Sequence, residues 1–232
     1  MIGCFRYLNA YPYRRLLEHA GMPYRLFDEP VALAEAWQRG EVAAALLPLR
    51  YVRRFGQVLP WGIGSAGPVQ SVLLLSDFPP ADWEAVVPDA ASTSSIALLR
   101  WLMGRKYLPS LPVLSYPTSL RVGRLFIGDS ALRWKKFYPY AIDLGAITHQ
   151  SSGKPFVYAV WCARKVLHGR LSRLFRQPWE IFSWAEEAAR EYRFSATEVY
   201  QYWQAIQYRL PRRMVRLWGR RLASASSKIP YL

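Results

Sequence analysis

The stretch Val42-Ala-Ala-Ala-Leu-Leu-Pro48 decides the fold class of this chain. It is a continuous apolar run, and the proline closes it. A strand with one exposed face alternates apolar and polar residues, so an unbroken run of this length is typical of a strand buried on both faces. Such strands belong to sheets that lie between layers of helices. The stretch therefore favours an α/β fold.

The residues that precede this strand alternate between strand and helix patterns. Ile2–Phe5 is apolar and suits a buried strand, and residues 13–20 follow Pro12 with helical spacing. A short strand is expected at residues 24–27, and a second helix from Pro30 to its stop at Gly40. The order strand, helix, strand, helix, strand predicts a parallel sheet.

Beyond Pro48 the pattern predicts a second group of strands and then a helical tail. A proline-rich change of character at residues 78–88 suggests a lobe boundary. We expect lobe 1 to comprise residues 1–75 plus 157–232 and lobe 2 residues 76–156, with the ligand cleft between them. The further elements expected are a glycine-rich loop at 62–68, strands at 69–76, 111–114, 125–127 and 156–162, and helices at 96–102, from about 131, and at 179–192, 195–210 and 212–223.

The excess of basic over acidic residues bears on the kind of partner that the protein binds. Lys and Arg number 31 against 16 Asp and Glu, a net charge of +15 in 232 residues. This favours an anionic partner, although basic charge also simply maintains solubility. Two cysteines, Cys4 and Cys162, are too few for a disulfide framework or a zinc site. The sequence contains no apolar run of spanning length and no recognisable signal peptide, so a cytoplasmic protein is expected.

Four short polar or glycine-containing loops are candidate ligand-binding segments. Three precede expected helices, where free backbone N–H groups attract carboxylates or phosphates. Each such loop also has a plain structural interpretation, because Ser, Thr, Asn and Asp are the ordinary N-cap residues. The loops are Tyr7–Asn9, Gly67–Ser71, Ser92–Ser95 and Gly128–Ser130.

Motifs of strong acid–base, nucleotide or metal chemistry are missing from the sequence. It contains no HExxH, no phosphate-binding Walker loop and no GxSxG elbow, and its three histidines are scattered. An enzyme built from these residues would work mainly by positioning and electrostatics.

Five segments of the sequence form a recognisable series. They are, in chain order, Tyr7-Leu-Asn-Ala-Tyr-Pro12, Gly67-Pro-Val-Gln-Ser-Val72, Ser92-Thr-Ser-Ser-Ile-Ala-Leu-Leu99, Ile127-Gly-Asp-Ser-Ala-Leu132 and Gly153-Lys-Pro-Phe-Val-Tyr-Ala-Val-Trp161. Together they resemble chorismate dehydratases of the futalosine route to menaquinone. Asp143-Leu-Gly145 and the helical tail also fit, so the resemblance covers nearly the whole chain.

The resemblance implies a two-lobed fold like the type II periplasmic binding proteins, with a helical C-terminal tail. It implies a carbon–oxygen lyase that removes water from chorismate to give 3-[(1-carboxyvinyl)oxy]benzoate, without metal or cofactor. Asn9 and Ser71 are implied as the catalytic residues. Neither motif holds a strong base, so we expect the enolpyruvyl carboxylate of the substrate to accept the proton. The implied substrate-binding residues are Tyr7, Gly67, Val69, Ser94, Ser95, Gly128 and Asp129.

The chain departs from its relatives at positions that bear on carboxylate binding. Thr93 stands where relatives usually carry Arg, and Leu49 stands where Ser is common. Arg6 or Arg50 is expected to supply the missing cation. A non-catalytic binding protein for a small aromatic carboxylate is the alternative function.

The C-terminal segment offers a third possibility, a basic surface. Either its arginines contact anionic lipid weakly, or they are solvated while the opposite face packs on the lobe. We expect chorismate as the ligand, no nucleic acid, and a monomer or homodimer. The basic residues are Arg212, Arg213, Arg216, Arg220 and Arg221, and the apolar ones are Met214, Val215, Trp218 and Leu222.

Overall fold

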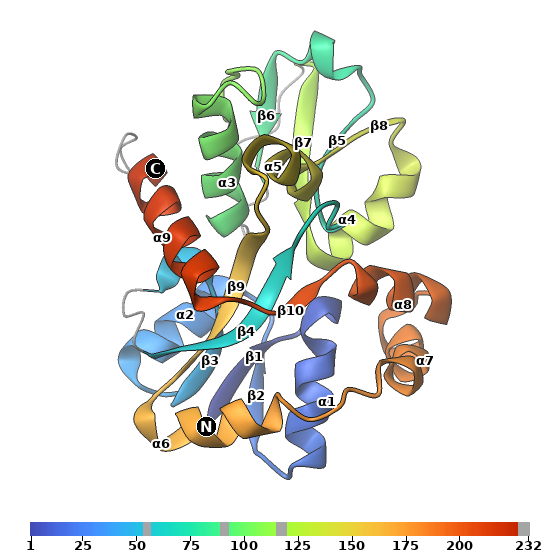
Figure 1. Ribbon diagram of the computed structural model, residues 1–232. Helices are drawn as coiled ribbons and strands as arrows, with labels where there is room; N and C mark the ends of the chain where they lie inside the picture. Colours follow the sequence, from blue (N-terminus) through green and yellow to red (C-terminus); the bar gives the residue numbers. More distant parts are fainter. Residues whose placement is uncertain (53–56, 89–92, 115–119, 227–232) are drawn as a thin grey trace.

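Two β-sheets with flanking helices make up the protein (Figure 1). The computed structural model describes residues 1–52, 57–88, 93–114 and 120–226. The six-stranded sheet has the order β10-β4-β9-β3-β1-β2 and the four-stranded sheet the order β6-β7-β5-β8. The strands are β1 (Ile2–Phe5), β2 (Tyr24–Phe27), β3 (Ala44–Pro48), β4 (Val58–Ser65), β5 (Val72–Ser76), β6 (Ala85–Val87), β7 (Val122–Ile127), β8 (Tyr140–Asp143), β9 (Phe156–Ala163) and β10 (Gln207–Arg209).

Helices surround both sheets. The α-helices are α1 (Tyr11–His19), α2 (Pro30–Arg39), α3 (Thr93–Gly104), α4 (Gly128–Trp134), α5 (Leu144–Ser152), α6 (Lys165–Leu174), α7 (Ile181–Tyr192), α8 (Ala196–Gln204) and α9 (Arg212–Ser226). Single 3₁₀ turns are η1 (Leu8–Ala10), η2 (Leu49–Tyr51), η4 (Pro80–Asp82) and η5 (Lys135–Phe137).

The first three strands confirm the expected alternation. β1 pairs in parallel with both β2 and β3, and α1 and α2 form the crossovers. Pro30 occupies the first turn of α2, and Gly40 ends the helix with a left-handed φ of 82°. These three strands are parallel, as expected, but the whole sheet is mixed, because β9 lies between β3 and β4 and is antiparallel to both. The order of strands that are distant in sequence is a tertiary property, which no local pattern encodes.

Several other local expectations are also wrong. Residues 62–65 of the expected glycine-rich loop belong to β4, where glycine allows the backbone of β9 to approach. A Cβ on Gly62 would lie 2.2 Å from the carbonyl oxygen of Ala159. The strand expected at 111–114 is only an isolated bridge between Val113 and Val86. The helix expected to span 195–210 ends at Gln204, and the short strand β10 follows it.

The expected cap at Gly128–Ser130 is also incorrect. These residues already form the first turn of α4, and Ile127 at the N-cap position makes no side-chain capping bond. The capping box of Ser195 and Glu198 at the start of α8 is confirmed, with both reciprocal hydrogen bonds present. β8 and α5 were not anticipated at all.

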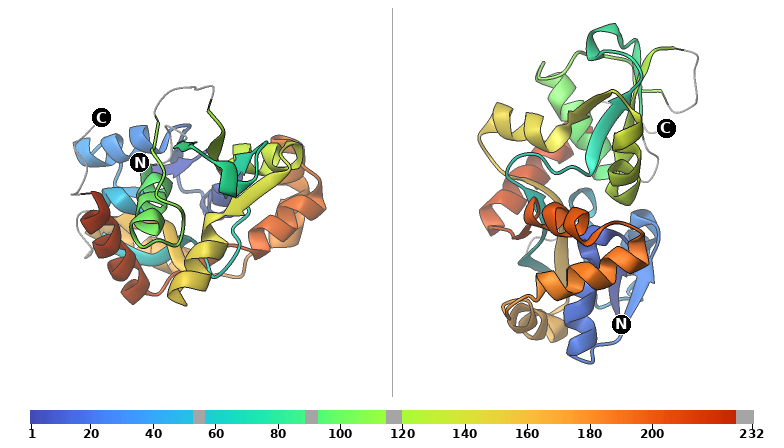
Figure 2. Two further views of the ribbon diagram at one scale, coloured as in Figure 1. Left: turned by 90° about the horizontal axis from the view of Figure 1, so that it is seen from above. Right: turned by 90° about the vertical axis from the view of Figure 1, so that its right-hand side faces the viewer.

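The chain leaves the first sheet after Ser65, enters the second at Val72, and returns at Phe156. If the lobes are defined by the sheet to which each strand belongs, the first boundary lies between Ser65 and Val72, a few residues before the expected boundary at residue 75. The division into lobes 1–75 plus 157–232 and 76–156 stays a prediction. Figure 2 shows the two sheets one above the other in its right-hand view, with α7 and α8 beside the first sheet.

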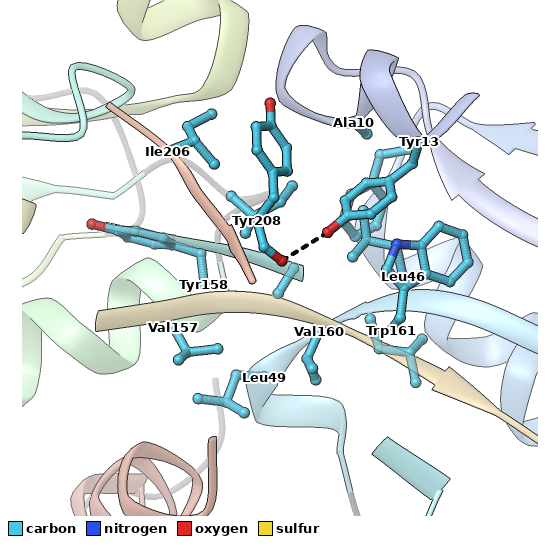
Figure 3. Packing of buried hydrophobic residues seen from close by; sticks show 14 of the residues in the cluster. Ala10, Tyr13, Leu46, Leu49, Val157, Tyr158, Val160, Trp161, Ile206 and Tyr208 are labelled. Carbon is cyan, nitrogen blue, oxygen red and sulfur yellow. Dashed lines mark hydrogen bonds between the residues drawn. The ribbon is translucent and has the colours of Figure 1, made fainter. Parts of the chain in front are cut away.

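A buried aromatic cluster joins the helical tail to the first sheet. Tyr13 of α1 is fully buried, and its single hydroxyl hydrogen is shared between the carbonyl oxygen of Gly62, at 2.8 Å, and that of Tyr208, at 3.1 Å (Figure 3). Its ring lies 5.4 Å from that of Trp161 in β9 and 4.9 Å from that of Phe175. One tyrosine thus connects α1, β4, β9 and β10, which gives β10 a fixed place at the sheet edge.

The last helix packs its apolar face inward, as the plain interpretation of its pattern expects. Val215 and Trp218 are buried, and the Trp218 ring meets that of Trp101 in α3 at 5.0 Å. Arg212, Arg213 and Arg216 are exposed. Because the apolar side chains of α9 are buried, only the positive charge of its exposed arginines is available for contact with a membrane surface. In the part of the chain that the structure describes, no helix is both long enough and apolar enough to cross a bilayer.

Candidate functional site

A cavity lies between the two sheets, at the ends of strands from both. It contains about 570 Å³ of space not filled by protein atoms, a volume that includes the part open to solvent. The first sheet and the loops after its strands supply one wall, and the second sheet with the start of α3 supplies the other. The lining residues are Phe5, Tyr7, Asn9, Pro30, Pro48, Ile63, Val69, Ser71, Val72, Ser94, Ser95, Ile127, Gly128, Tyr158 and Ala159.

Most of the residues expected from the sequence come together here. Two loops and two helix starts place them around one space, although the most distant are more than a hundred positions apart. Gly67 and Asp129 are not in the lining. The expected residues that do line the cavity are Tyr7, Asn9, Val69, Ser71, Ser94, Ser95 and Gly128.

The Asp143 carboxylate holds the loop that carries Ser71. It accepts hydrogen bonds from the backbone N–H groups of Val69, at 3.0 Å, and Gln70, at 2.7 Å. It also caps α5 by accepting from Gly145 and Ala146, at 2.8 and 3.1 Å. Gln70 has a left-handed φ of 63°, which is costly for a residue with a side chain. The carboxylate therefore compensates a strained turn just before Ser71.

The position after Leu144 requires glycine because α5 packs very closely against its neighbours there. A Cβ at this position would lie 2.7 Å from the carbonyl oxygen of Gly67 and 2.8 Å from the Tyr158 hydroxyl. Only a residue without a side chain lets α5 pack this closely against the loop and against β9. The segment Asp143-Leu-Gly145 is thus a support for the cavity wall rather than part of the lining.

The loop that carries Asn9 is held from three sides. The backbone N–H of Leu8 donates to the Asp129 carboxylate at 3.0 Å, and the Leu8 carbonyl accepts from the Trp203 indole at 2.9 Å. The Tyr192 hydroxyl donates to the Arg6 carbonyl at 2.8 Å. Burial raises the pKa of Asp129 to about 6, while the Leu8 N–H and the Arg133 charge act in the opposite direction. Asp129 therefore positions the loop of Asn9 from outside the cavity.

Asn9 presents an unused acceptor. Its Oδ1 is buried and has no hydrogen-bond partner among the described residues. Buried polar atoms are almost always partnered, so an unpartnered oxygen beside a cavity indicates an acceptor for a ligand donor. Ser71 presents the complementary group. Its hydroxyl oxygen accepts a hydrogen bond from the buried hydroxyl of Tyr202, at 2.9 Å.

The polar groups of the lining are neutral. Hydroxyls and one amide supply them, and no charged side chain belongs to the lining within the described ranges. Ser94 and Ser95 lie in the first turn of α3, where backbone N–H groups lack helical partners. Neither arginine expected to replace the missing cation lines the cavity. Arg6 forms an exposed ion pair with Asp28 at 2.6 Å, and Arg50 is exposed.

Two residues of importance were missed by the sequence analysis. Tyr158 lies within the motif at 153–161, and its hydroxyl is 3.2 Å from that of Ser65. Its place in that motif was the available signal, because every residue of β9 is buried and no apolar–polar alternation marks the face toward the cavity. Tyr202 has no such signal, because its partner Ser71 is 131 positions away. Among the described residues, no group of three His, Cys, Asp or Glu side chains could hold a metal ion.

The fold is that of the periplasmic binding proteins. The alkanesulfonate-binding protein SsuA from Xanthomonas axonopodis pv. citri, bound to MOPS, is 13% identical, with a TM-score of 0.64 over 99% of this chain and 93% of that one. The Candida albicans CA3427 gene product, described as having the generic periplasmic binding protein fold, is 10% identical, with a TM-score of 0.55 over 100% and 91%. Protein AF1704 from Archaeoglobus fulgidus is 11% identical, with a TM-score of 0.61 over 97% and 96%. At these identities the likeness concerns the fold alone.

The sequence match is more specific. Residues 1–216 match the protein family described as "Menaquinone biosynthesis". The chain belongs to this family, which confirms the family expected from the five segments. A role in menaquinone biosynthesis follows from that membership.

Proposed function

We propose that this protein is a chorismate dehydratase, a carbon–oxygen lyase that converts chorismate to 3-[(1-carboxyvinyl)oxy]benzoate and water. The observation that carries the proposal is the cavity, which gathers Asn9, Ser71 and the Ser94–Ser95 turn inside largely apolar walls. These are the positions that match the motifs of chorismate dehydratases. The membership in a menaquinone biosynthesis family supports the same assignment.

The walls suit the ring of the substrate. Phe5, Ile63, Val72 and Ile127 provide apolar contact from both sheets, and Tyr158 adds an aromatic face. A ring held between such walls has less freedom to reach the geometry of competing rearrangements. Holding the reactive conformation is the larger part of what an enzyme without a strong acid–base pair can contribute.

The substrate carboxylates meet neutral donors. The first turn of α3, with Ser94 and Ser95, offers N–H groups that have no partner within the helix, hydroxyls and the positive end of the helix dipole to one carboxylate. Thr93 at the start of this helix supplies no charge. The binding energy for this carboxylate then comes from hydrogen bonds, and only weakly from long-range charge.

In the reaction, the C3–H bond and the C4–O bond of the ring break. The C3 proton passes to the enolpyruvyl carboxylate of the substrate, and the electron pair forms the C3–C4 double bond that completes the aromatic ring. The C4 hydroxyl leaves as hydroxide and takes up that proton, so the second product is water. Ser71 donates a hydrogen bond to the C4 oxygen, and the free Oδ1 of Asn9 accepts from the same hydroxyl before it departs.

A binding protein for a small aromatic carboxylate is the second candidate. The neutral lining within the described ranges favours it, because the chain itself provides no general base there. The fold is shared with a protein that binds alkanesulfonates, which are also small anions. In this case the same residues would hold the ligand without turning it over.

The remaining expectations become part of the proposal. We place the enzyme in the cytoplasm, as a monomer or homodimer with two lobes that enclose the cavity. Contact of α9 with a membrane surface is electrostatic and weak, since its apolar side chains are covered.

Incubation of the purified protein with chorismate tests the assignment. Mass spectrometry is expected to detect an aromatic product one water lighter than the substrate. Unchanged chorismate, with binding still visible by calorimetry, would support the binding protein instead.

A further inference from the structure

The hydroxyl of Tyr202 reaches Ser71 from the helical tail. Tyr202 lies on α8, and its Oη donates to Ser71 Oγ at 2.9 Å. Both residues are buried, at 1% and 3% exposure, so water does not compete for this bond. Among the described residues, Ser71 has no other side-chain hydrogen bond.

This bond determines the direction of the serine proton. A hydroxyl has one hydrogen to donate and two lone pairs that accept. Tyr202 donates to one lone pair, and nothing in the described structure accepts the Ser71 hydrogen. Since Ser71 lines the cavity, a ligand oxygen is the natural acceptor for that hydrogen. Without Tyr202, the same hydroxyl could rotate and lose this preference.

Trp203, the residue after Tyr202 on α8, contacts the loop that carries Asn9. The Trp203 indole donates to the Leu8 carbonyl at 2.9 Å, and its ring stacks on Tyr11 at 5.9 Å. Burial raises the pKa of Tyr202 well above its usual value, so its hydroxyl keeps the hydrogen that it donates to Ser71. Neighbouring residues of one tail helix therefore contact both loops that carry the proposed catalytic residues.

We propose that Tyr202 is a positioning residue of this site, which orients the Ser71 hydroxyl as a hydrogen-bond donor into the cavity. The acceptor is an oxygen of the ligand, either a carboxylate or the hydroxyl that departs. For the effect on catalysis the inference rests on the proposed function. For the effect on ligand binding it does not.

A double-mutant cycle tests this role. Tyr202→Phe removes only the hydroxyl and is expected to lower kcat by about 3- to 10-fold, the loss typical of one oriented hydrogen bond, with KM within about twofold. In a Ser71→Ala background the same change is expected to have no further effect on kcat, because no hydroxyl remains to orient. Equal losses in both backgrounds would overturn the inference.

Tyr208→Phe is the matched control. Tyr208 is a buried tyrosine of the neighbouring β10, and its hydroxyl has no hydrogen-bond partner among the described residues. Its replacement is expected to leave kcat unchanged. A loss of kcat equal to that of Tyr202→Phe would attribute the effect to general packing and overturn the inference.

Calorimetric binding of 3-hydroxybenzoate separates this inference from the proposed function. If wild-type protein binds this probe but does not convert chorismate, the proposed function fails. A several-fold weaker binding by Tyr202→Phe, absent in the Ser71→Ala background, would then still support the positioning role. If the substitution changes neither kcat nor the affinity for the probe, or if wild-type protein shows neither turnover nor binding, the inference is overturned.

Discussion

A hydrogen bond from the Leu8 backbone N–H to the Asp129 carboxylate links the part of the protein built on the first sheet to the part built on the second. The bond is 3.0 Å long and connects the first turn of α4 with the loop that carries Asn9. Gly128 beside it lies against the ring of Tyr7, since a Cβ there would be 3.5 Å from that ring. The segment Gly128–Asp129 is therefore a contact between the two halves, and a ligand that closes the cavity must be compatible with it.

The first prediction concerns this carboxyl group and pH. Burial raises the pKa of Asp129 from 3.8 to about 6, so the folded state binds the proton more tightly than the unfolded state. The contribution of this group to stability is complete below about pH 4 and is lost as the pH rises through about 6. The loss amounts to up to about 3 kcal/mol, at ~1.4 kcal/mol for each pKa unit.

The measurement compares wild-type protein with Asp129→Asn in urea unfolding between pH 4 and pH 8. Subtraction removes the other carboxyl groups from the comparison. The stability of wild type relative to the variant is expected to fall across this range. A difference that rises with pH would mean that the buried group is a stabilised carboxylate instead.

The second prediction concerns Asp143. Asp143→Ala removes four backbone hydrogen bonds and leaves Gln70 in its left-handed conformation without support. The free energy of unfolding is expected to fall by about 2–3 kcal/mol, and ligand affinity should fall because the Ser71 loop loosens. Ser195→Ala, which removes only the cap of α8, should cost about 1 kcal/mol and leave affinity unchanged. Equal affinity in both variants would contradict the assigned support.

The third prediction concerns two glycines. Gly145→Ala places a methyl group within 3 Å of the Gly67 carbonyl and the Tyr158 hydroxyl, and is expected to cost about 1–3 kcal/mol and to weaken ligand binding. Gly104→Ala, at the end of α3 where no atom lies within 4 Å of the new methyl group, is expected to stabilise by up to about 1 kcal/mol. Thermal unfolding and calorimetry provide both readouts. A stable, tightly binding Gly145→Ala protein would show that α5 can shift freely.

The fourth prediction concerns salt. Because the described lining of the cavity is neutral, the affinity for 3-hydroxybenzoate is expected to change by less than about threefold between roughly 0.01 M and 0.15 M salt. Calorimetric titration at the two ionic strengths is the measurement. A steep loss of affinity would mean that exposed arginines, rather than the turn at Ser94 and Ser95, hold the carboxylate.

Local patterns in the sequence were sufficient to predict the helix ends and caps that depend only on neighbouring residues. Pro30 and Gly40 bound α2, and Ser195 with Glu198 caps α8, because each of these signals acts within one turn of helix. Strand β9 was found from its apolar run, yet its antiparallel place in the sheet was not, since strand order depends on residues far apart in the chain. β10, with only three residues, carries too short a pattern to detect.

The residues of the candidate site also divide into those that a local motif marks and those whose role depends on distant parts of the chain. Asn9 and Ser71 were proposed because motifs mark them, and the fold brings both to one cavity. Asp143 was noticed only as part of a motif, because its role depends on backbone N–H groups about 74 positions earlier. Tyr202 carries only the pattern of a buried helix face, and nothing local distinguishes a core tyrosine from one that orients a serine.

Turnover of chorismate by wild type, Asn9→Ala and Ser71→Ala, followed by mass spectrometry beside thermal unfolding of each protein, tests the central claim most directly. The account predicts that wild type forms a product one water lighter. Each substitution should lower kcat by about 100- to 1,000-fold, the effect of losing a hydrogen bond made in the transition state, with little change in melting temperature. The account is contradicted if wild type leaves chorismate intact, or if both variants melt early but keep normal turnover per folded molecule.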